Sequence, residues 1–417
     1  MKWPIEVFIA LRYLRPRRTF VSVITVLSVL GVTLAVMVLI VVLSVMAGFE
    51  KDLRDKIIGF NAHLSVAEGG PMPDYAALLD KIGREPGVVA AAPYVSGPVV
   101  AEFLAHDSGP VLRGIDPEAE EKVLPVANTI IAGELELRGD SVVVGDEWAR
   151  YNHAMVGDKI TIYGPHQLHS LRALRDPHAP KDLVLPTELE ITGIFRTGLY
   201  DYDLNFFITS LENAQYLYDV PGAVHGISVR VADPLKVDAV KARLERDLGP
   251  GVMVRTWQDQ NRSLFTAIAT ERVAMAFILF FIMIVAAFGL CSTLITITVQ
   301  KAREIGVLKA LGAGDFQILG IFVTHGLIVG LIGAASGVVL AGVVLYYRNP
   351  FRDLLSQRFG IDVFSADVYN FAQIPAEVSL GQVAAIAGSA VVICMLAALI
   401  PAQGAARLEP VKALRYE

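Results

Sequence analysis

The sequence predicts a membrane protein with four transmembrane α-helices and a large α+β domain inserted between the first and second helices. The chain of 417 residues is 54% hydrophobic, with a mean hydropathy of +0.51. A helix needs roughly 20 apolar residues to cross a hydrocarbon core, and four stretches reach that length: residues 20–46, 275–299, 318–347 and 383–401. Between the first two, residues 47–274 carry the mixed polar and apolar pattern of a folded domain.

The distribution of basic residues predicts how the chain crosses the membrane. Lysines and arginines are frequent before the first span, and they recur in the segments at 300–316 and 402–417. Residues 47–274, by contrast, hold 22 Lys and Arg against 33 Asp and Glu. Because basic loops stay on the cytoplasmic side, we expect both termini and residues 300–316 in the cytoplasm. The large domain is then expected on the opposite side.

Short strand and helix patterns alternate along the large domain. Strand patterns bounded by Gly, Pro and Asp occupy 63–66, 95–103, 111–115, 141–144, 159–163, 188–195, 205–209 and 226–231. Helix patterns occupy 74–84, 211–217 and 234–248. This order favours an α+β domain over a regular βαβ array. Residues 49–58 and 259–274 are expected to continue the first and second spans as unbroken helices, which would connect the domain stiffly to the membrane.

The remaining segments are short. Residues 1–19 contain an apolar helix pattern, which we expect at the cytoplasmic membrane interface. Residues 348–382 are expected to form a loop on the outer side, and residues 402–417 a cytoplasmic tail. The two cysteines, Cys291 and Cys394, both fall within predicted spans, so we expect apolar packing and no disulfide framework.

A charged stretch at 301–313 lies between the second and third spans, where a short solvated turn is usual. It combines charged with apolar residues: Lys301, Arg303, Glu304 and Lys309 with Ile305, Val307, Leu308 and Leu311. A helix with a polar and an apolar side is suited to packing against another surface. We therefore predict a short amphipathic helix that presses on a cytoplasmic partner.

An insertion at 163–186 is rich in proline, histidine and leucine. A loop of this length inside a compact domain is usually functional or disordered. Its three histidines suggest a metal site, but they lack cysteine partners and an i, i+4 pairing. A projecting hook with apolar tips that grips a partner, and a simple mobile insertion, are the other two interpretations.

Motifs for catalysis are missing from the chain. No G-x-x-x-x-G-K-[ST], G-x-S-x-G or H-E-x-x-H occurs, so we predict a non-catalytic chain that binds no metal or cofactor of its own.

His325 is the only ionisable residue we note within the spans, and a position at the membrane interface is the simplest explanation for it. Two pairs of glycines spaced by four predict close helix packing in the third span: Gly326 and Gly330, then Gly333 and Gly337.

Several segments carry a resemblance to a known family: residues 10–14, 28–32, 41–50, 303–313, 401–402 and 410–417. The sequence resembles the transmembrane subunits of the bacterial lipoprotein-releasing ABC transporter, the LolC/LolE family, within the wider MacB/FtsX-like group of permeases. Residues 303–313 and the tail are typical of the whole group, whereas residues 43–50 are more specific to the lipoprotein-releasing branch. The resemblance covers essentially the whole chain. It implies a multi-pass protein of the bacterial inner membrane with a MacB-like periplasmic core domain at 47–274.

The resemblance also implies partners. Two such subunits, identical or related, would join two copies of a separate LolD-like ATPase, which binds ATP and Mg. The complex would extract outer-membrane lipoproteins from among the membrane lipids and pass them to a LolA-like periplasmic chaperone. No nucleic-acid partner is expected.

Three groups of residues receive roles from the same resemblance. Those expected to contact the ATPase are Lys301, Arg303, Glu304, Ile305, Gly306, Leu308 and Lys309. Those expected to line the lipoprotein cavity, at the outer ends of the first two spans, are Ser44, Val45, Met46, Phe49, Phe265 and Ile268. Those of the candidate chaperone-binding hook are Tyr163, Pro165, Leu168, Leu171, Leu174 and Pro186.

Two related functions remain as alternatives. A MacB-like subunit would transmit motion to an export channel, although such exporters typically carry a fused ATPase that this sequence lacks. An FtsX-like subunit would regulate cell-wall hydrolases, although its outer domain is usually much smaller.

Overall fold

The computed structural model describes residues 20–104, 106–168, 185–359 and 373–409. The described residues divide into a helical unit (20–51, 266–359 and 373–409) and an α/β unit (52–104, 106–168 and 185–265). Some predictions fall outside them: the interfacial helix at 1–19, part of the 348–382 loop, the end of the tail, and Leu171 and Leu174 of the hook.

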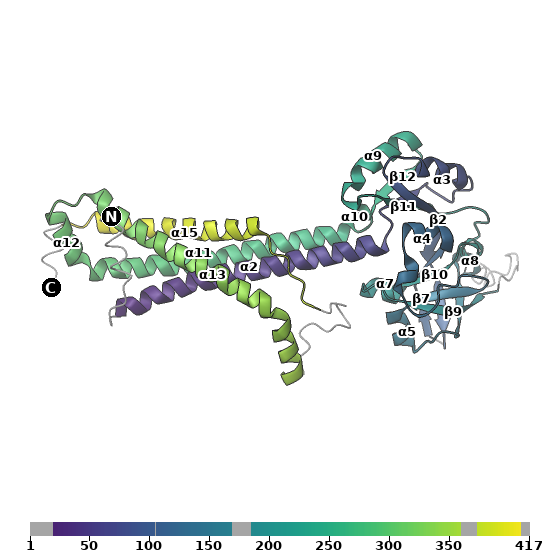
Figure 1. The fold of residues 1–417 in the computed structure, drawn as a ribbon, viewed down its shortest axis with the longest axis horizontal. Coiled ribbons are helices and arrows are strands. Elements are labelled where there is room, and N and C mark those ends of the chain that lie inside the picture. The colour runs from purple at the N-terminus through teal and green to yellow at the C-terminus, as the bar shows by residue number, and fades with distance from the viewer. Residues whose placement is uncertain (1–19, 105, 169–184, 360–372, 410–417) are drawn as a thin grey trace, which may run out of the picture. The chain divides into compact units, whose positions relative to one another are not determined.

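Four long helices make up most of the helical unit. They are α2 (Phe20–Phe60), α11 (Arg262–Gln300), α13 (Asp315–Phe359) and α15 (Leu380–Ala406). They lie alongside one another, and the short helix α12 (Ala302–Ala310) joins α11 to α13 (Figure 1). Within the described residues, these four helices are long and apolar enough to cross a membrane. The predicted number of spans is therefore confirmed.

Glycines allow α13 to pack closely against two other helices. A Cβ atom built on Gly326 would lie 2.7 Å from the Cβ of Ala398 in α15, and one built on Gly337 would lie 2.7 Å from the Cβ of Val36 in α2. Such distances are shorter than any ordinary contact, so a larger residue would push the helices apart. Gly330 approaches α15 and Gly333 approaches α2 in the same way.

The core of the helical unit also contains buried polar side chains. The hydroxyls of Ser28 in α2 and Thr293 in α11 lie 2.6 Å apart and hydrogen-bond across the two helices. His325 in α13 is only 1% exposed, and neither of its ring nitrogens has a hydrogen-bond partner among the described residues. The ring of His325 is thus enclosed by the helices, and its interfacial depth in the membrane stays a prediction.

The α/β unit is built on one mixed sheet. Its strands, within the described residues, are β1 (Leu64–Ala67), β2 (Val88–Pro98), β3 (Val100–Phe103), β4 (His106–Ser108), β5 (Val111–Ile115), β6 (Ile130–Gly133), β7 (Ser141–Gly145), β8 (Lys159–Tyr163), β9 (Thr187–Phe195), β10 (Phe206–Ser210), β11 (Gly226–Val231) and β12 (Met253–Thr256). Their order is β12-β1-β11-β2-β5-β10-β7-β9-β8-β3-β4, and β6 pairs with β9. The pairs β10–β5 and β7–β9 are parallel, and the other pairs are antiparallel. The predicted α+β class is confirmed.

Short helices connect these strands and cover the sheet. They are α3 (Tyr75–Gly83), α4 (Pro117–Val123), α5 (Asp146–Asn152), α7 (Tyr200–Asn205), α8 (Leu211–Leu217), α9 (Val237–Leu248) and α10 (Trp257–Gln260), with the 3-10 turns η1 (Val126–Thr129) and η2 (Pro234–Lys236). Asp116 starts α4 by accepting hydrogen bonds from two backbone N–H groups, and Ser210 starts α8 by accepting one from Asn213. Trp257, Phe195 and Phe207 are the largest fully buried side chains of the unit.

The predicted continuous helix at 259–274 is interrupted. Helix α10 ends at Gln260, Asn261 leaves the helical conformation, and α11 begins at Arg262. Thr256 and Asp259 form a capping box that starts the short helix α10, and at its other end the Asn261 side chain donates to the carbonyl of Trp257. An asparagine side chain that bonds to nearby backbone competes with the helix. The chain therefore enters α11 through a one-residue break.

The predicted strand at 95–103 is also two strands. β2 ends at Pro98 and β3 begins at Val100. Pro98 has no N–H group to continue the ladder, and the N–H of Val99 donates to the carbonyl of Pro110 instead.

Candidate functional site

Helix α12 forms where the sequence analysis expects a partner-binding helix. It follows a one-residue turn at Lys301 and ends before Gly312, whose φ of +100° lets the chain reverse into α13. Asp315 is the acidic residue in the first turn of α13. The turn and the helix together place a short amphipathic element at one end of the helical unit.

One side of α12 belongs to the core of the helical unit. Ile305 is 2% exposed and Gly306 is buried, and Leu308 packs partly against the same core. The ammonium group of Lys309 donates to the carbonyls of Ala406 (2.6 Å) and Leu408 (3.0 Å) at the end of α15. Four of the seven residues predicted to contact an ATPase therefore hold the helix in place.

The other side of α12 is open. Arg303 and Glu304 are exposed, and Glu304 pairs with Lys301. Three apolar side chains of the same segment are exposed as well: Val307 of α12 is 43% exposed, Leu311 is 81% exposed, and Phe316 at the start of α13 is 89% exposed. We call these five residues the coupling face: Arg303, Glu304, Val307, Leu311 and Phe316. The sequence-based list of ATPase-contacting residues does not include Phe316. A large apolar residue so close to the Gly312 turn, among charged residues, could have pointed to it.

The residues predicted for the lipoprotein cavity lie in both units. Ser44 is 2% exposed, whereas Val45, Met46 and Phe49 of the same helix are half-buried. These three side chains leave apolar surface on α2.

The two candidates in α11 differ from one another. Ile268 is buried within the helical unit. Phe265 belongs to the α/β unit, where its ring packs edge-on against Trp257 at 5.4 Å. These contacts give Phe265 a local packing role in the α/β unit.

The described part of the candidate hook lies next to β8. The Tyr163 hydroxyl donates to the carboxylate of Glu102 (2.9 Å), and this bond raises the pKa of Tyr163. Gly164 donates to the Gln167 side chain, and a Cβ on Gly164 would lie 2.2 Å from the carbonyl of Leu217. Pro165 and Leu168 are half-buried, and Pro186, before β9, is exposed. The base of the insertion is thus well packed.

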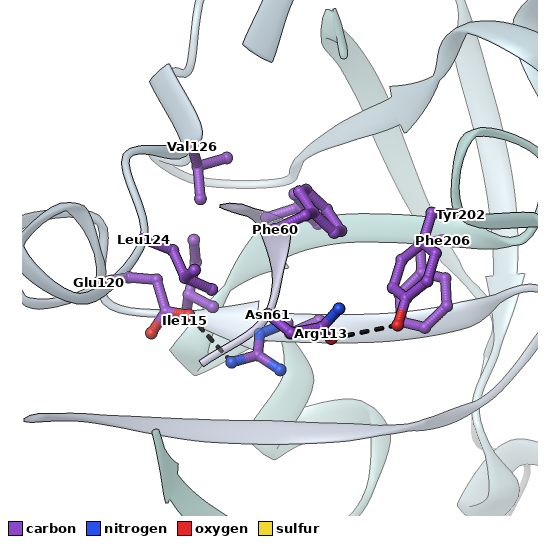
Figure 2. Close-up of a pocket in the computed structure, with 10 residues that line it drawn as sticks. Phe60, Asn61, Arg113, Ile115, Glu120, Leu124, Val126, Tyr202 and Phe206 are labelled. Carbon is purple, nitrogen blue, oxygen red and sulfur yellow. Dashed lines mark hydrogen bonds and ion pairs between the residues drawn. The ribbon is translucent and has the colours of Figure 1, made fainter. Parts of the chain in front are cut away.

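A pocket opens in the α/β unit beside the end of α2 (Figure 2). Its empty volume is about 390 Å³, which includes space open to solvent. Aromatic rings of Phe60, Tyr202 and Phe206 contact one another on one side. On the other side Arg113 donates to Glu120 (2.9 Å), whose second carboxylate oxygen has no partner among the described residues.

The described residues offer no catalytic arrangement at these places. They contain no group of three or more His, Cys, Asp or Glu side chains that could hold a metal ion. The pocket combines one ion pair with aromatic and aliphatic walls and contains no nucleophile beside a base. The surfaces described above are suited to binding.

Comparison with known proteins agrees with this architecture. Residues 25–247 match the MacB-like periplasmic core domain, and residues 276–410 match the FtsX-like permease C-terminal domain. Over 99% of both chains, the sequence is 33% identical to the lipoprotein-releasing system transmembrane protein LolC of Neisseria meningitidis and 30% identical to LolC of Xylella fastidiosa. It is 26% identical to the corresponding protein LolE of Haemophilus influenzae over 98% of both chains.

These matches, together with the four long helices and the inserted α/β unit, define a membrane permease of the MacB/FtsX-like class of ABC transporters. Within that class, the LolC and LolE relatives match this chain over 98–99% of its length. The chain belongs to the LolC/LolE family of lipoprotein-releasing system transmembrane proteins.

Proposed function

We propose that this chain is the permease subunit of an ATP-driven transporter that extracts outer-membrane lipoproteins from the inner membrane and hands them to a periplasmic chaperone. The full-length similarity to lipoprotein-releasing system proteins carries the proposal. The apolar surface that Val45, Met46 and Phe49 leave on α2 is compatible with acyl chains. The subunit pairs with a second permease subunit, identical or related.

The energy for extraction comes from a separate ATPase subunit, which binds ATP and Mg. The coupling face supports this part of the proposal, because the segment 303–316 exposes the large apolar side chains of Leu311 and Phe316 together with the charged Arg303 and Glu304. Exposed apolar side chains surrounded by charged residues are typical of protein interfaces. In this arrangement α12 lies in the cytoplasm, both termini lie there too, and the α/β unit lies in the periplasm.

Recruitment of the chaperone through residues 163–186 stays a prediction. The packed base around Tyr163 and Gln167 is compatible with a projecting hook, while its predicted apolar tips, Leu171 and Leu174, lie outside the described residues.

Depletion of the chain in its native bacterium tests the proposal. Inner and outer membranes would be separated by density, and outer-membrane lipoproteins would be followed by immunoblotting. We expect these lipoproteins to accumulate in the inner membrane as the chain disappears. Normal lipoprotein sorting, combined with a defect in cell division or efflux, would overturn the proposal in favour of an FtsX-like or MacB-like role.

A further inference from the structure

Residues 373–379, which we call the connector, follow the end of α13 and lead into α15. Two bonds tie the connector to α13. The guanidinium group of Arg348 donates to the carbonyl of Ile374 (2.7 Å), and the N–H of Ile374 donates to the side-chain oxygen of Asn349 (2.9 Å). Both polar groups of the Ile374 backbone are therefore satisfied by side chains of one helix. The connector is fixed at this end without secondary structure of its own.

The connector also crosses α2. The N–H of Glu377 donates to the carbonyl of Ser44 (2.9 Å), and the carboxylate of Glu377 pairs with Lys51 (3.0 Å). Both charged side chains are about half exposed, so the ion pair itself contributes little stability. The backbone bond places the connector directly on the helix surface.

Gly48 is the residue that permits this crossing. A Cβ atom on Gly48 would lie 2.4 Å from the nitrogen of Ala376 and 2.6 Å from the carbonyl carbon of Pro375. These are backbone atoms, which cannot turn aside as a flexible side chain can. Gly31, in the same helix, has nothing within 4 Å of its Cβ position. The two glycines therefore make a matched pair, one at a contact and one at an open position.

Helical geometry shows what the connector covers. Ser44, Gly48 and Lys51 are spaced by four and three residues, so they share one face of α2. Glu50 points to a different side, where it pairs with Arg272 of α11 (2.9 Å). Since successive residues are turned by about 100°, half-buried Met46 and Phe49 project away from the connector face, whereas Val45 lies at its edge. Ser44 lies beneath the connector and is withdrawn from any ligand while the connector is seated.

We propose that Gly48 is a positioning residue for transport: it seats the connector on α2, fixes α2 to α13, and restricts lipoprotein acyl chains to the side of the helix that carries Met46 and Phe49. The seating of the connector follows from the contacts above alone. The part concerning acyl chains rests on the proposed function.

The accessibility of the connector to a labelling reagent tests whether Gly48 seats it on α2. Ala376→Cys would be introduced into the full chain within its membrane complex and labelled with a membrane-impermeant maleimide, with the parent chain as the background for Cys291 and Cys394. Adding Gly48→Ala is expected to raise the labelling rate at position 376 several-fold. Adding Gly31→Ala is expected to leave the rate unchanged. Equal labelling in all three chains would overturn the inference, whatever the transported substrate.

Transport measurements test the positioning role. With reconstituted complex, Gly48→Ala is expected to lower the lipoprotein released per ATP hydrolysed several-fold while ATP hydrolysis continues, and Gly31→Ala is expected to match the parent chain. Faster labelling at position 376 with unchanged release would overturn the positioning role. If Gly48→Ala does not assemble, Asn349→Ala loosens the other end of the connector and is expected to change labelling and release in the same directions. Normal lipoprotein sorting after depletion would instead overturn the proposed function and leave the labelling result intact.

Discussion

At the scale of single residues, the α/β unit depends on a few buried polar groups that need their partners. The Arg113 guanidinium group donates to Glu120 and to the Ser228 hydroxyl, and it stacks over the ring of Tyr94 at 4.6 Å. Glu120 is 1% exposed. A carboxylate enclosed to this degree needs its cation, because an unpaired buried charge is costly.

Removing that cation should therefore destabilise the unit. We expect Arg113→Ala to lower the free energy of unfolding by about 3 kcal/mol, since Glu120 loses its partner. Urea unfolding of the full chain in detergent, followed by the fluorescence of buried Trp148 and Trp257, measures the change. Arg84→Ala is the matched control, because Arg84 pairs with Asp80 on the surface, and its effect should stay within about 0.5 kcal/mol. Equal effects of the two substitutions would contradict this account of Glu120.

His63 makes the stability of the α/β unit depend on pH. Burial lowers the pKa of His63. A hydrogen bond to the backbone of Val231, whose carbonyl oxygen lies 3.1 Å from Nδ1, acts in the opposite direction but is the smaller effect. The unfolded chain, where the histidine pKa is about 6.5, then binds more protons than the folded chain below that pH. Acidification from pH 7.5 to 5.5 should therefore favour unfolding.

The contribution of His63 is measured by substitution. Between pH 7.5 and 5.5, we expect the free energy of unfolding to fall less in His63→Gln than in the parent chain. His106→Gln, at an exposed histidine, should keep the parent slope. Burial also raises the pKa of Asp203, which acts in the opposite direction, so the difference between variants is the relevant quantity. An unchanged slope in His63→Gln would rule out His63 as the source.

At the scale of elements, α12 shows how one short helix serves two surfaces. Ile305 and Gly306 pack into the helical core, and Lys309 bonds to the end of α15. The coupling face is exposed in the described structure and is the surface proposed to bind the ATPase. Substitutions on the two sides should therefore have different consequences: those facing the core change stability, and those on the coupling face change binding.

The coupling face can be tested without disturbing the fold. Leu311→Ala and Phe316→Ala are each expected to reduce the amount of ATPase that co-purifies with the chain by about tenfold, which corresponds to about 1.4 kcal/mol. Both side chains are more than four-fifths exposed, so the thermal stability of the chain should hardly change. Tyr346→Ala is the control, because Tyr346 is an equally exposed aromatic residue in the same helix. Unaltered co-purification of the ATPase with both variants would exclude this surface.

At the scale of the whole molecule, the proposed arrangement separates α12 and the α/β unit by the membrane. Single cysteines at Arg303 and at Asp107, both exposed positions, should report this separation. In intact cells with a permeabilised outer membrane, an impermeant maleimide is expected to label Asp107→Cys and to spare Arg303→Cys. Disruption of the inner membrane should make both react. Labelling of Arg303→Cys in intact cells would reverse the proposed orientation.

The four spans and most strands of the α/β unit could be predicted because each depends on a local pattern of apolar residues. β4, β6 and β12 escaped prediction, since they lie at or near sheet edges and bury few side chains. The break at Asn261 depends on a side-chain bond that apolar periodicity does not reveal.

The candidate sites were less predictable than the spans. Which residues of α12 face inward depends on α15, because Lys309 bonds to a carbonyl 97 residues further along the chain. The contact at Gly48 likewise depends on the connector, which is distant in sequence. Local composition could predict a short helix at 301–313, but it could not divide that helix into its two sides.

The bonds of Lys309 have a mechanical consequence. Besides the two carbonyls at the end of α15, its ammonium group pairs with Asp315 (2.9 Å), in the first turn of α13. A single side chain thus joins three helices at one point. A displacement of α12 would therefore be transmitted to α13 and α15 at the same time, so that these two helices would move together and not one after the other.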